Sequence, residues 1–233
     1  MNRQVAQLFF IQPQMQTGNG KVSKILIVDG YPIFRQGLVQ ILSPHHDVSV
    51  CGVAATAAQG VDGASRLRPD LVLLDVSLPD RSGLEAIKKI RGKHSEMKIL
   101  AVSMHDETVY APRVLRLGGN GYIMKREEPA EVLSAIRRVL GGETYLSPAM
   151  LARKKSKIPR SREIRPLDAL TDSQLEIVEL LGQGTTYAEM AARLGQSALA
   201  IVSECEAIRK TLRLRSENAL IRYAVHWLEL EIK

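Results

Sequence analysis

Four polar side chains stand directly after four short apolar runs in the first 125 residues of the chain. The runs KILIV, DLVLL, KILAV and GYIM are followed by Asp29, Asp75, Ser103 and Lys125. An acid pair, a hydroxyl and an ammonium at one place suit a phosphoryl group together with a divalent cation. In such a site Asp75 is the nucleophile, and Asp29 helps to hold Mg²⁺, which prefers oxygen ligands. Each residue alone could merely end a strand, but four in chain order favour a functional site.

These side chains can meet only if the apolar runs before them are neighbouring strands of one sheet. From Lys24 onward, five short and nearly continuous apolar runs alternate with segments of helical period, and VSVCGVA is the remaining run. Apolar runs of this kind are typical of parallel strands that are covered on both faces. Functional groups gather beyond the carboxyl ends of such strands. We therefore expect a five-stranded parallel, doubly wound α/β domain over residues 23–146.

The second half of the chain has a purely helical period, which predicts an all-α domain over residues 167–233. The segments 171–174 and 186–189 match the capping-box pattern at the starts of two helices. A third helix is expected to begin at Ser197 and a fourth to follow it. The third helix would bury one stripe of side chains, namely Ile201, Cys205, Ile208 and Leu212.

Composition narrows the class of protein. The 233 residues are 45% hydrophobic and 24% charged, which suits a soluble protein of two modest domains. No apolar run approaches the roughly 18 residues of a membrane span, so we expect no membrane contact. Two cysteines exclude a disulfide framework and favour the reducing cytoplasm. Residues 1–22 are expected to form a disordered tail, because glutamine interrupts their apolar patch.

The positive charge is concentrated between the two predicted domains. The net charge of the chain is +7, and residues 151–166 contain seven Lys and Arg against one Glu. We interpret residues 147–166 as a basic linker. Residues 167–233 contain seven Lys and Arg against ten Asp and Glu, a net charge of −3. This acidity opposes DNA binding, because neutralisation of phosphates supplies most of the affinity.

Longer stretches of the chain resemble a known family. KILIVDGYPIFRQGL, PDLVLLDVSLPDRSGLEAI, KILAVSMHDE and GYIMKREEPAEVLSAIRRVLGGETYLSP are similar to the receiver domain of a two-component response regulator. LTDSQLEIVELLGQGTTYAEMAARLGQS resembles the LuxR-type helix-turn-helix of the NarL/FixJ family. The resemblance implies that Asp75 is the phosphoacceptor and that Ser103 is the switch hydroxyl. It also implies that Tyr122 is the switch aromatic and that Lys125 is the lysine of the family pattern.

The resemblance further implies a Mg²⁺ site made by Asp29, Asp75 and the backbone carbonyl of Ser77. The family pattern has two adjacent acids after the first strand, whereas here Gly30 follows Asp29. The missing acid is usually a direct metal ligand, although a water molecule could replace one oxygen. We therefore expect weakened Mg²⁺ binding and weakened phosphorylation.

Pro112 interrupts the segment TVYAPRVLRL, which is the fourth expected helix of the first domain. If that helix begins at Asp106, the proline removes a needed N–H and loosens the first turn. If it begins late, near Ala111, the proline stands where helices tolerate it. Both starts fit the pattern.

The third helix of the second domain, residues 197–212, is the one that would enter a DNA groove. The positions that are often basic in related domains are Val202 and Glu206 here, with Glu204 between them. A carboxylate near the phosphates opposes association, while basic residues at the helix end could grip the backbone without reading sequence. The DNA contacts implied by the resemblance are Thr186, Ser197, Val202, Ser203, Glu206, Arg209, Lys210 and Arg213.

The expected function is that of a response regulator and not of an enzyme. A histidine kinase or a small phosphodonor would phosphorylate Asp75, and this would control a DNA-binding, transcription-regulating domain that acts as a homodimer. The alternative is an interaction protein derived from such a regulator, which is weakly phosphorylated, reads no DNA and dimerises with other regulators. A phosphatase with an aspartyl-phosphate intermediate is less favoured, because it needs a second acid where Ser77 stands.

Overall fold

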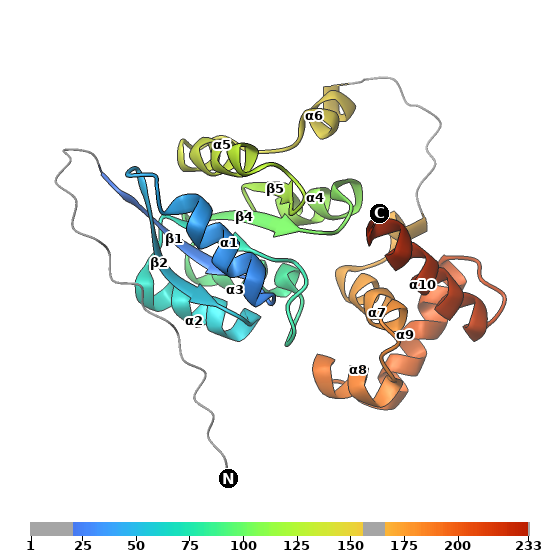
Figure 1. Ribbon diagram of the computed structural model, residues 1–233. Helices are drawn as coiled ribbons and strands as arrows, with labels where there is room; N and C mark the ends of the chain where they lie inside the picture. The colour runs from blue at the N-terminus through green and yellow to red at the C-terminus, as the bar shows by residue number, and fades with distance from the viewer. Residues whose placement is uncertain (1–20, 156–165, 233) are drawn as a thin grey trace, which may run out of the picture. The chain divides into compact units, whose positions relative to one another are not determined.

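The described part of the chain forms two compact units. The computed structural model describes residues 21–155 and 166–232, so the predicted tail of residues 1–22 lies almost wholly outside it. The first unit holds the described residues up to Ser103 and Tyr110–Ser147, and the second holds Met104–Val109 and the residues from Pro148 onward. Most of their elements are labelled in Figure 1.

Five parallel strands form the sheet of the first unit, in the order β2-β1-β3-β4-β5. This confirms the predicted five-stranded parallel sheet. The chain passes from β1 to β2 on one side and then crosses to β3 on the other side. The carboxyl ends of β1 and β3 therefore flank the point where strand order reverses, which is where ligands bind in open α/β sheets. The strands are β1 (Ser23–Val28), β2 (Val48–Ala54), β3 (Leu71–Leu74), β4 (Lys98–Ser103) and β5 (Gly121–Met124).

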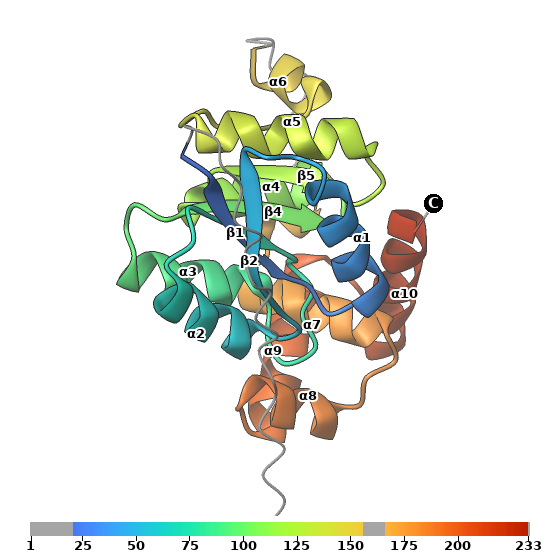
Figure 2. The same ribbon diagram turned by 60° about the vertical axis from the view of Figure 1, so that its left-hand side comes forward.

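Helices cover both faces of the sheet, as Figure 2 shows. Helices α1 and α5 lie on one face, and α2 and α3 pack together on the other. Proline is the first residue of both α1 and α5, where its missing N–H costs nothing. The bounds are α1 (Pro32–Leu42), α2 (Ala57–Leu67), α3 (Gly83–Lys93), α4 (Glu107–Arg116) and α5 (Pro129–Leu140).

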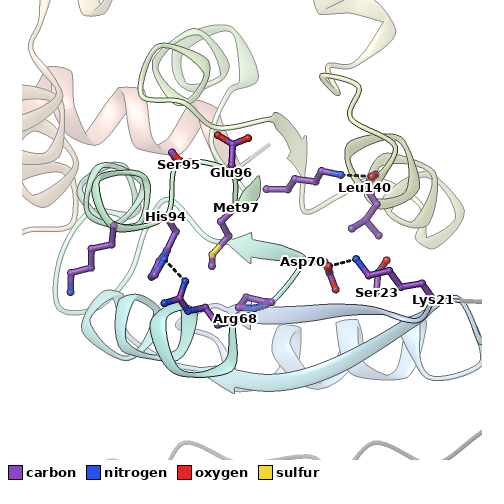
Figure 3. Close-up of a pocket in the computed structure, with 12 residues that line it drawn as sticks. Lys21, Ser23, Arg68, Asp70, His94, Ser95, Glu96, Met97 and Leu140 are labelled. Atoms are coloured by element: carbon purple, nitrogen blue, oxygen red, sulfur yellow. Dashed lines mark hydrogen bonds and ion pairs between the residues drawn. The ribbon is translucent and has the colours of Figure 1, made fainter.

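A hollow of about 650 Å³ opens at the amino ends of the strands (Figure 3). Several basic side chains line it, and three of them are engaged in local contacts. Lys21 lies 3.1 Å from the carboxylate of Asp70, and Arg68 Nη1 contacts His94 Nδ1 at 3.3 Å. Lys98 donates to the last carbonyl of α5, where the helix dipole favours a cation. These side chains stabilise helix ends and loops at the edge opposite the predicted site.

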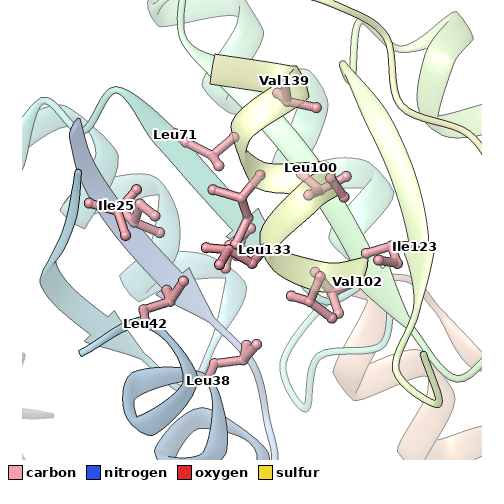
Figure 4. Close-up of a cluster of buried hydrophobic side chains, with 14 of the residues drawn as sticks. Ile25, Leu38, Leu42, Leu71, Leu100, Val102, Ile123, Leu133 and Val139 are labelled. Carbon is pink, nitrogen blue, oxygen red and sulfur yellow. The ribbon is translucent and has the colours of Figure 1, made fainter. Parts of the chain in front are cut away.

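The strands alternate their side chains between two buried layers. One layer packs against α1 and α5 and is drawn in Figure 4. The intervening residues are equally buried on the other face, which explains why the apolar runs are continuous rather than alternating. In the strands, the first layer includes Ile25, Ile27, Leu71, Leu73, Leu100, Val102 and Ile123. The opposite layer includes Leu26, Val28, Val72, Leu74, Ile99 and Ala101, none more than 1% exposed.

Helix α4 spans Glu107–Arg116 and contains Pro112 at its sixth position. The alternative of a late start near Ala111 is therefore wrong. The carboxylate of Asp106 accepts a hydrogen bond from the Thr108 N–H at 2.7 Å, which holds the first turn. The helix thus keeps its beginning although the proline removes one later hydrogen bond.

The second unit is all-α, as predicted. Both capping boxes are formed: Thr171 pairs with Gln174, and Thr186 pairs with Glu189. Gly195 ends α8 in the left-handed conformation with φ 65°. Part of the predicted linker is helical, because Pro148 starts a run of good helix formers. The elements are α6 (Pro148–Lys155), the 3₁₀ helix η1 (Pro166–Ala169), α7 (Asp172–Gly182), α8 (Tyr187–Leu194), α9 (Ala198–Thr211) and α10 (Glu217–Ile232).

The start of α3 requires a glycine. A Cβ atom at Gly83 would collide with the backbone carbonyl of Asp75 and lie 2.6 Å from Val76 Cα. Gly83→Ala is therefore expected to lower the free energy of unfolding by about 3 kcal/mol, the upper range for overpacking. Gly92→Ala in the same helix is the matched control, because nothing lies within 4 Å of its Cβ position. It should stabilise by about 0.5 kcal/mol. Urea unfolding compares the two, and equal stabilities would contradict the prediction.

Candidate functional site

A buried ammonium joins two carboxylates at the carboxyl ends of β1 and β3. Lys125 Nζ lies 2.5 Å from Asp29 Oδ2 and 2.7 Å from Asp75 Oδ2, and none of the three side chains is more than 3% exposed. The other two carboxylate oxygens accept backbone N–H groups, from Tyr31 at 2.8 Å and from Ser77 at 3.1 Å. Every oxygen of the two carboxylates therefore has a donor, which a buried ion cluster needs in order to be stable.

The sheet itself positions these residues. The Asp75 N–H donates to Val28 O at 2.8 Å, and the Lys125 N–H donates to Ser103 O at 2.8 Å. The Asp29 N–H likewise donates to the last residue of β2 at 3.0 Å. The parallel hydrogen-bond ladder thus continues one residue past the strand ends. The backbones of the three charged residues are therefore positioned by strand pairing as well as by their own side-chain contacts.

The predicted switch residues belong to β4 and β5, the two strands that follow β3 in the sheet. Ser103 ends β4, and Tyr122 lies opposite Ala101 in the ladder; both Ser103 and Tyr122 are fully buried. The Tyr122 N–H donates to Tyr145 O at 3.1 Å, and the Tyr145 N–H donates to Asn120 O at 3.0 Å. The segment that follows α5 therefore pairs with β5 along its free edge. The backbone of the predicted switch aromatic is bonded directly to the residues that lead to α6.

The loop after Asp75 is held from several sides. Ser77 and Ser82 form an antiparallel bridge across it. The Asp80 carboxylate accepts the first two N–H groups of α2, at 2.7 and 3.0 Å, and so ties the loop to that helix. Pro79 lies against Gly30, where a Cβ atom would be 3.1 Å from Pro79 Cδ. These contacts fix the backbone of Ser77, the residue expected to offer its carbonyl to a metal.

Three residues of the site escaped the sequence analysis. The rings of Tyr31 and Phe34 lie 5.0 and 4.6 Å from Lys125 Nζ, within the range of cation–π contacts. Arg35 Nη1 donates to the backbone carbonyl of Asp29 at 2.5 Å. All three follow Asp29 at the start of α1, and this proximity was the available signal. Phe34 matched the helical spacing of a core residue, so its apolar character concealed the contact.

The electrostatics of the cluster affect Asp75 most. Burial raises the pKa of Asp75 from its ordinary value of 3.8 to about 6. The ammonium of Lys125 opposes this rise, and the charge of Asp29 adds to it. Two carboxylates against one ammonium leave a net charge of −1 when both acids are ionised. An added cation is therefore still attracted to the cluster, but less than it would be with a third acid.

The residues present fit a magnesium ion in part. Among residues 21–155 and 166–232, no group of three or more His, Cys, Asp or Glu side chains is arranged to hold a metal. Asp29 and Asp75 offer two carboxylates, and Ser77 O faces the Gly30 position, 3.9 Å from a Cβ atom placed there. Mg²⁺ keeps several waters, so two carboxylates and one carbonyl form an acceptable but incomplete ligand set.

In the second unit, α9 divides into a buried stripe and an exposed face. Ile201, Cys205 and Ile208 are buried, as predicted. Thr186 and Ser197, two predicted DNA contacts, serve as helix N-caps and accept the N–H groups of Glu189 and Ala200, respectively. The predicted contacts that stand on the exposed face are Val202, Ser203, Glu206 and Lys210.

The two glutamates near the middle of α9 are oriented differently. Glu204 is half-buried and accepts a hydrogen bond from Gln174 Nε2 of α7 at 3.1 Å. Glu206 is exposed, and Lys210 Nζ lies 3.0 Å from its carboxylate. The hydrogen bond from Lys210 lowers the pKa of Glu206. One carboxylate is thus held toward α7, and the other has a basic partner on its own helix.

The basic residues at the end of α9 also have distinct positions. Arg209 is half-buried, and its guanidinium donates to the carbonyls of Leu214 and Arg215 at 3.5 and 3.4 Å. Arg213 is exposed and has a φ of 55°, the left-handed region that favours glycine. Arg209 therefore closes the helix end, while Arg213 extends from the turn that follows.

Comparisons with known proteins agree with this architecture. The family model described as response regulator receiver domain matches residues 25–137. The nitrate/nitrite response regulator protein NarL of Escherichia coli (strain K12) is 32% identical over 202 residues, which are 85% of this chain and 93% of NarL. The oxygen regulatory protein NreC of Staphylococcus aureus (strain JH9) is 32% identical over 209 residues, covering 87% of this chain and 96% of NreC.

Solved structures give the same fold. One is RcsB from Salmonella enterica serovar Typhimurium, bound to promoter rprA. The match covers 88% of this chain and 99% of the RcsB chain, with a TM-score of 0.70 and 22% identity. A LuxR-family two-component response regulator from Aurantimonas sp. SI85-9A1 is 30% identical, covers 57% of this chain and 94% of its own, and has a TM-score of 0.55.

The parallel sheet with its buried acid pair and lysine defines a receiver domain. The chain belongs to the NarL/FixJ family of two-component response regulators, which are regulators and not enzymes. The predicted resemblance is therefore confirmed. Within the described residues, no helix is both long and apolar enough to cross a membrane.

The raised pKa of Asp75 predicts a pH-dependent stability in metal-chelating buffer. The folded protein holds this proton with a pKa of about 6, against 3.8 for the ordinary carboxyl, so protonation favours folding. As pH rises from about 4 to about 7, the free energy of unfolding of the wild type should fall by about 2 kcal/mol relative to Asp75→Asn. Urea unfolding at several pH values measures this difference.

A control for this pH profile is Asp47→Asn. Arg137 holds the pKa of the Asp47 carboxyl below its usual range through a hydrogen bond, so its contribution has the opposite sign and is lost as pH falls. Parallel pH profiles for wild type and Asp75→Asn would contradict the assignment.

Proposed function

We propose that this chain is a transcription regulator in which phosphorylation of Asp75 controls DNA binding by the helix-turn-helix domain. The contact of Lys125 with both Asp29 and Asp75 carries the proposal, because it places a cation beside a buried nucleophilic carboxylate. The proposed limits are residues 23–146 for the receiver domain, 147–166 for the linker and 167–233 for the DNA-binding domain.

In the phosphorylation step, a carboxylate oxygen of Asp75 bonds to phosphorus of a phosphohistidine or a small phosphodonor. The bond from phosphorus to the donor's nitrogen or oxygen breaks, and the leaving group departs with its electron pair. Lys125 then contacts a phosphoryl oxygen, because the new group adds a charge of about −1.5 to −2. Its ammonium offsets charge that develops during transfer.

The signal would leave the site through β4 and β5. The Ser103 hydroxyl would donate a hydrogen bond to a phosphoryl oxygen, and the Tyr122 side chain would change position together with Ser103. The support for a direct route is the hydrogen bond from the Tyr122 N–H to Tyr145 O, which joins β5 to the segment before α6. A change in β5 would therefore act on the start of the linker, and on dimerisation or release of the DNA-binding domain.

Mg²⁺ would be held by Asp29, Asp75 and the Ser77 carbonyl, with water completing its shell. When bound, the ion offsets the negative charge of the carboxylates and the incoming phosphoryl group. The chain's own contribution is the fixed loop after Asp75, which Asp80 ties to α2. Gly30 leaves the ligand set one carboxylate short.

Gly30→Asp is expected to tighten Mg²⁺ binding by roughly tenfold, because added ligand charge strengthens oxygen sites. The new Cβ atom would stand 3.1 Å from Pro79 Cδ, so that ring must shift by a few tenths of an ångström. Calorimetric titration with MgCl₂ measures the affinity, and thermal unfolding in chelator checks the fold. Gly30→Asn has nearly the same shape without the charge. An equal gain for Asn, or no gain for Asp, would contradict the prediction.

DNA binding is supported by the family and by α9. RcsB, whose fold this chain shares, has been solved bound to promoter DNA and as two dimers bound to two parallel DNAs. We propose that this chain likewise binds DNA as a homodimer, with α9 of each copy in the major groove. A histidine kinase or a small phosphodonor is its proposed phosphoryl source, and a cytoplasmic location follows from these partners.

The decisive experiment selects fragmented genomic DNA with the purified full chain over a salt series, with and without a small phosphodonor. We expect the bound fragments to share a sequence motif, and we expect this binding to persist at physiological salt. The motif should be enriched more strongly after phosphodonor treatment. The Asp75→Asn variant should bind the same DNA, and the phosphodonor should not change its enrichment of the motif. Sequence-blind binding that disappears with salt would contradict the proposal, because phosphate attraction alone gives that behaviour. It would favour the alternative of an interaction protein that dimerises with other regulators.

A further inference from the structure

We infer that α9 reads thymine methyl groups in the major groove through Leu199 and Val202. The inference deepens the proposed DNA-binding function and rests on it. It assigns sequence specificity to two apolar side chains, at a helix where charged or hydrogen-bonding groups are the expected readers. Thymine is the base whose major-groove edge carries a methyl group, and apolar side chains contact it favourably.

Leu199 and Val202 are large apolar side chains that remain outside the core. Leu199 is 76% exposed and Val202 is 44% exposed. They stand three residues apart in the first half of α9, so they share one side of the helix. The N-terminal residues of a recognition helix are the ones that contact base edges. The exposed pair therefore stands where sequence is read.

The fold does not need this pair for packing. The buried stripe of α9 is already filled by Ile201, Cys205 and Ile208, which are at most 5% exposed. Leu199 lies away from this stripe, and Val202 lies at its edge, where it lines a surface hollow with Cys205 and Glu206. Exposed apolar groups this large gain free energy when a partner surface removes them from water.

The polar side chains around the pair are engaged within the protein. The Ser203 hydroxyl donates to Leu199 O at 3.0 Å. The Glu206 carboxylate contacts Lys210 at 3.0 Å, and Glu204 accepts its hydrogen bond from α7. Reading by hydrogen bonds would require these contacts to break, whereas methyl contact by Leu199 and Val202 requires no exchange.

Charge identifies DNA as the occupant of this surface. Arg213 and Arg215 are exposed in the turn after α9, whereas the exposed Lys210 is paired with Glu206. Phosphate contacts position a protein on the duplex, and base contacts specify the sequence. An apolar reading pair followed by two exposed arginines matches a groove that contains methyl groups and is bordered by phosphates.

The test uses the motif recovered by the selection experiment and the full chain. Each thymine of the motif is replaced in turn by deoxyuridine, which differs only by the absence of the methyl group. At one or more positions we expect affinity to fall roughly fourfold per methyl, the factor given by burying one methylene-sized group. Fluorescence anisotropy at fixed salt measures each dissociation constant.

Two variants locate the contact, and two serve as controls. Leu199→Ala and Val202→Ala should each reduce the discrimination between thymine and deoxyuridine while binding deoxyuridine DNA as the wild type does. Thr211→Ala, at an exposed position near the end of the same helix, should leave the discrimination unchanged. Arg213→Ala should weaken binding to both DNAs equally and reduce the salt dependence. Both reading residues are exposed, so circular dichroism is expected to confirm that the variants fold.

Outcomes against the inference are distinct from failure of the proposed function. If a motif is recovered but contains no thymine, or is bound equally with deoxyuridine, DNA reading stands and the methyl inference is wrong. Discrimination that persists in the Leu199→Ala, Val202→Ala double variant also overturns it. If no motif is recovered, the proposed DNA function fails and the inference fails with it. The exposed pair would then be assigned to a protein partner.

Discussion

The contact of one buried ammonium with two carboxylates is the constraint on which the receiver unit depends. Asp29, Asp75 and Lys125 come from the ends of β1, β3 and β5, and β4 lies between the last two. Strands two positions apart are separated by about 10 Å, so the lysine must reach across the end of β4. Ser103 ends that strand, which is why a hydroxyl lies beside the charges. A one-residue slip of any of these strands would turn its polar residue to the other face.

The same constraint explains why the fold and the central site could be predicted from sequence. Continuous apolar runs, each followed by a polar residue, encode both the parallel sheet and the edge at which the polar residues meet. Capping boxes at Thr171 and Thr186 are equally local, and both are formed. These features depend on residues that are close in sequence or on the regular backbone hydrogen bonds of the sheet. Short-range patterns therefore sufficed for them.

The features that escaped prediction depend on long-range contacts. Asp80 caps a helix that begins 23 residues earlier, and nothing near Asp80 in the sequence indicates that partner. The direction of Glu204 depends on Gln174, which is 30 residues away. Residue type gave the chemistry in each case, but the partner was fixed only by the fold.

The hydrogen bond between Gln174 and Glu204 restricts which side chains can serve at position 174. Glutamate and glutamine are interchangeable in most capping boxes, because either offers an oxygen to the N-cap N–H. Here Gln174 Oε1 accepts from the Thr171 N–H while its Nε2 donates to Glu204, so both ends of the amide are used. Glutamate would preserve the cap but place a second carboxylate against Glu204. The N-cap of α7 and the direction of the Glu204 side chain on α9 therefore both depend on the amide group of Gln174.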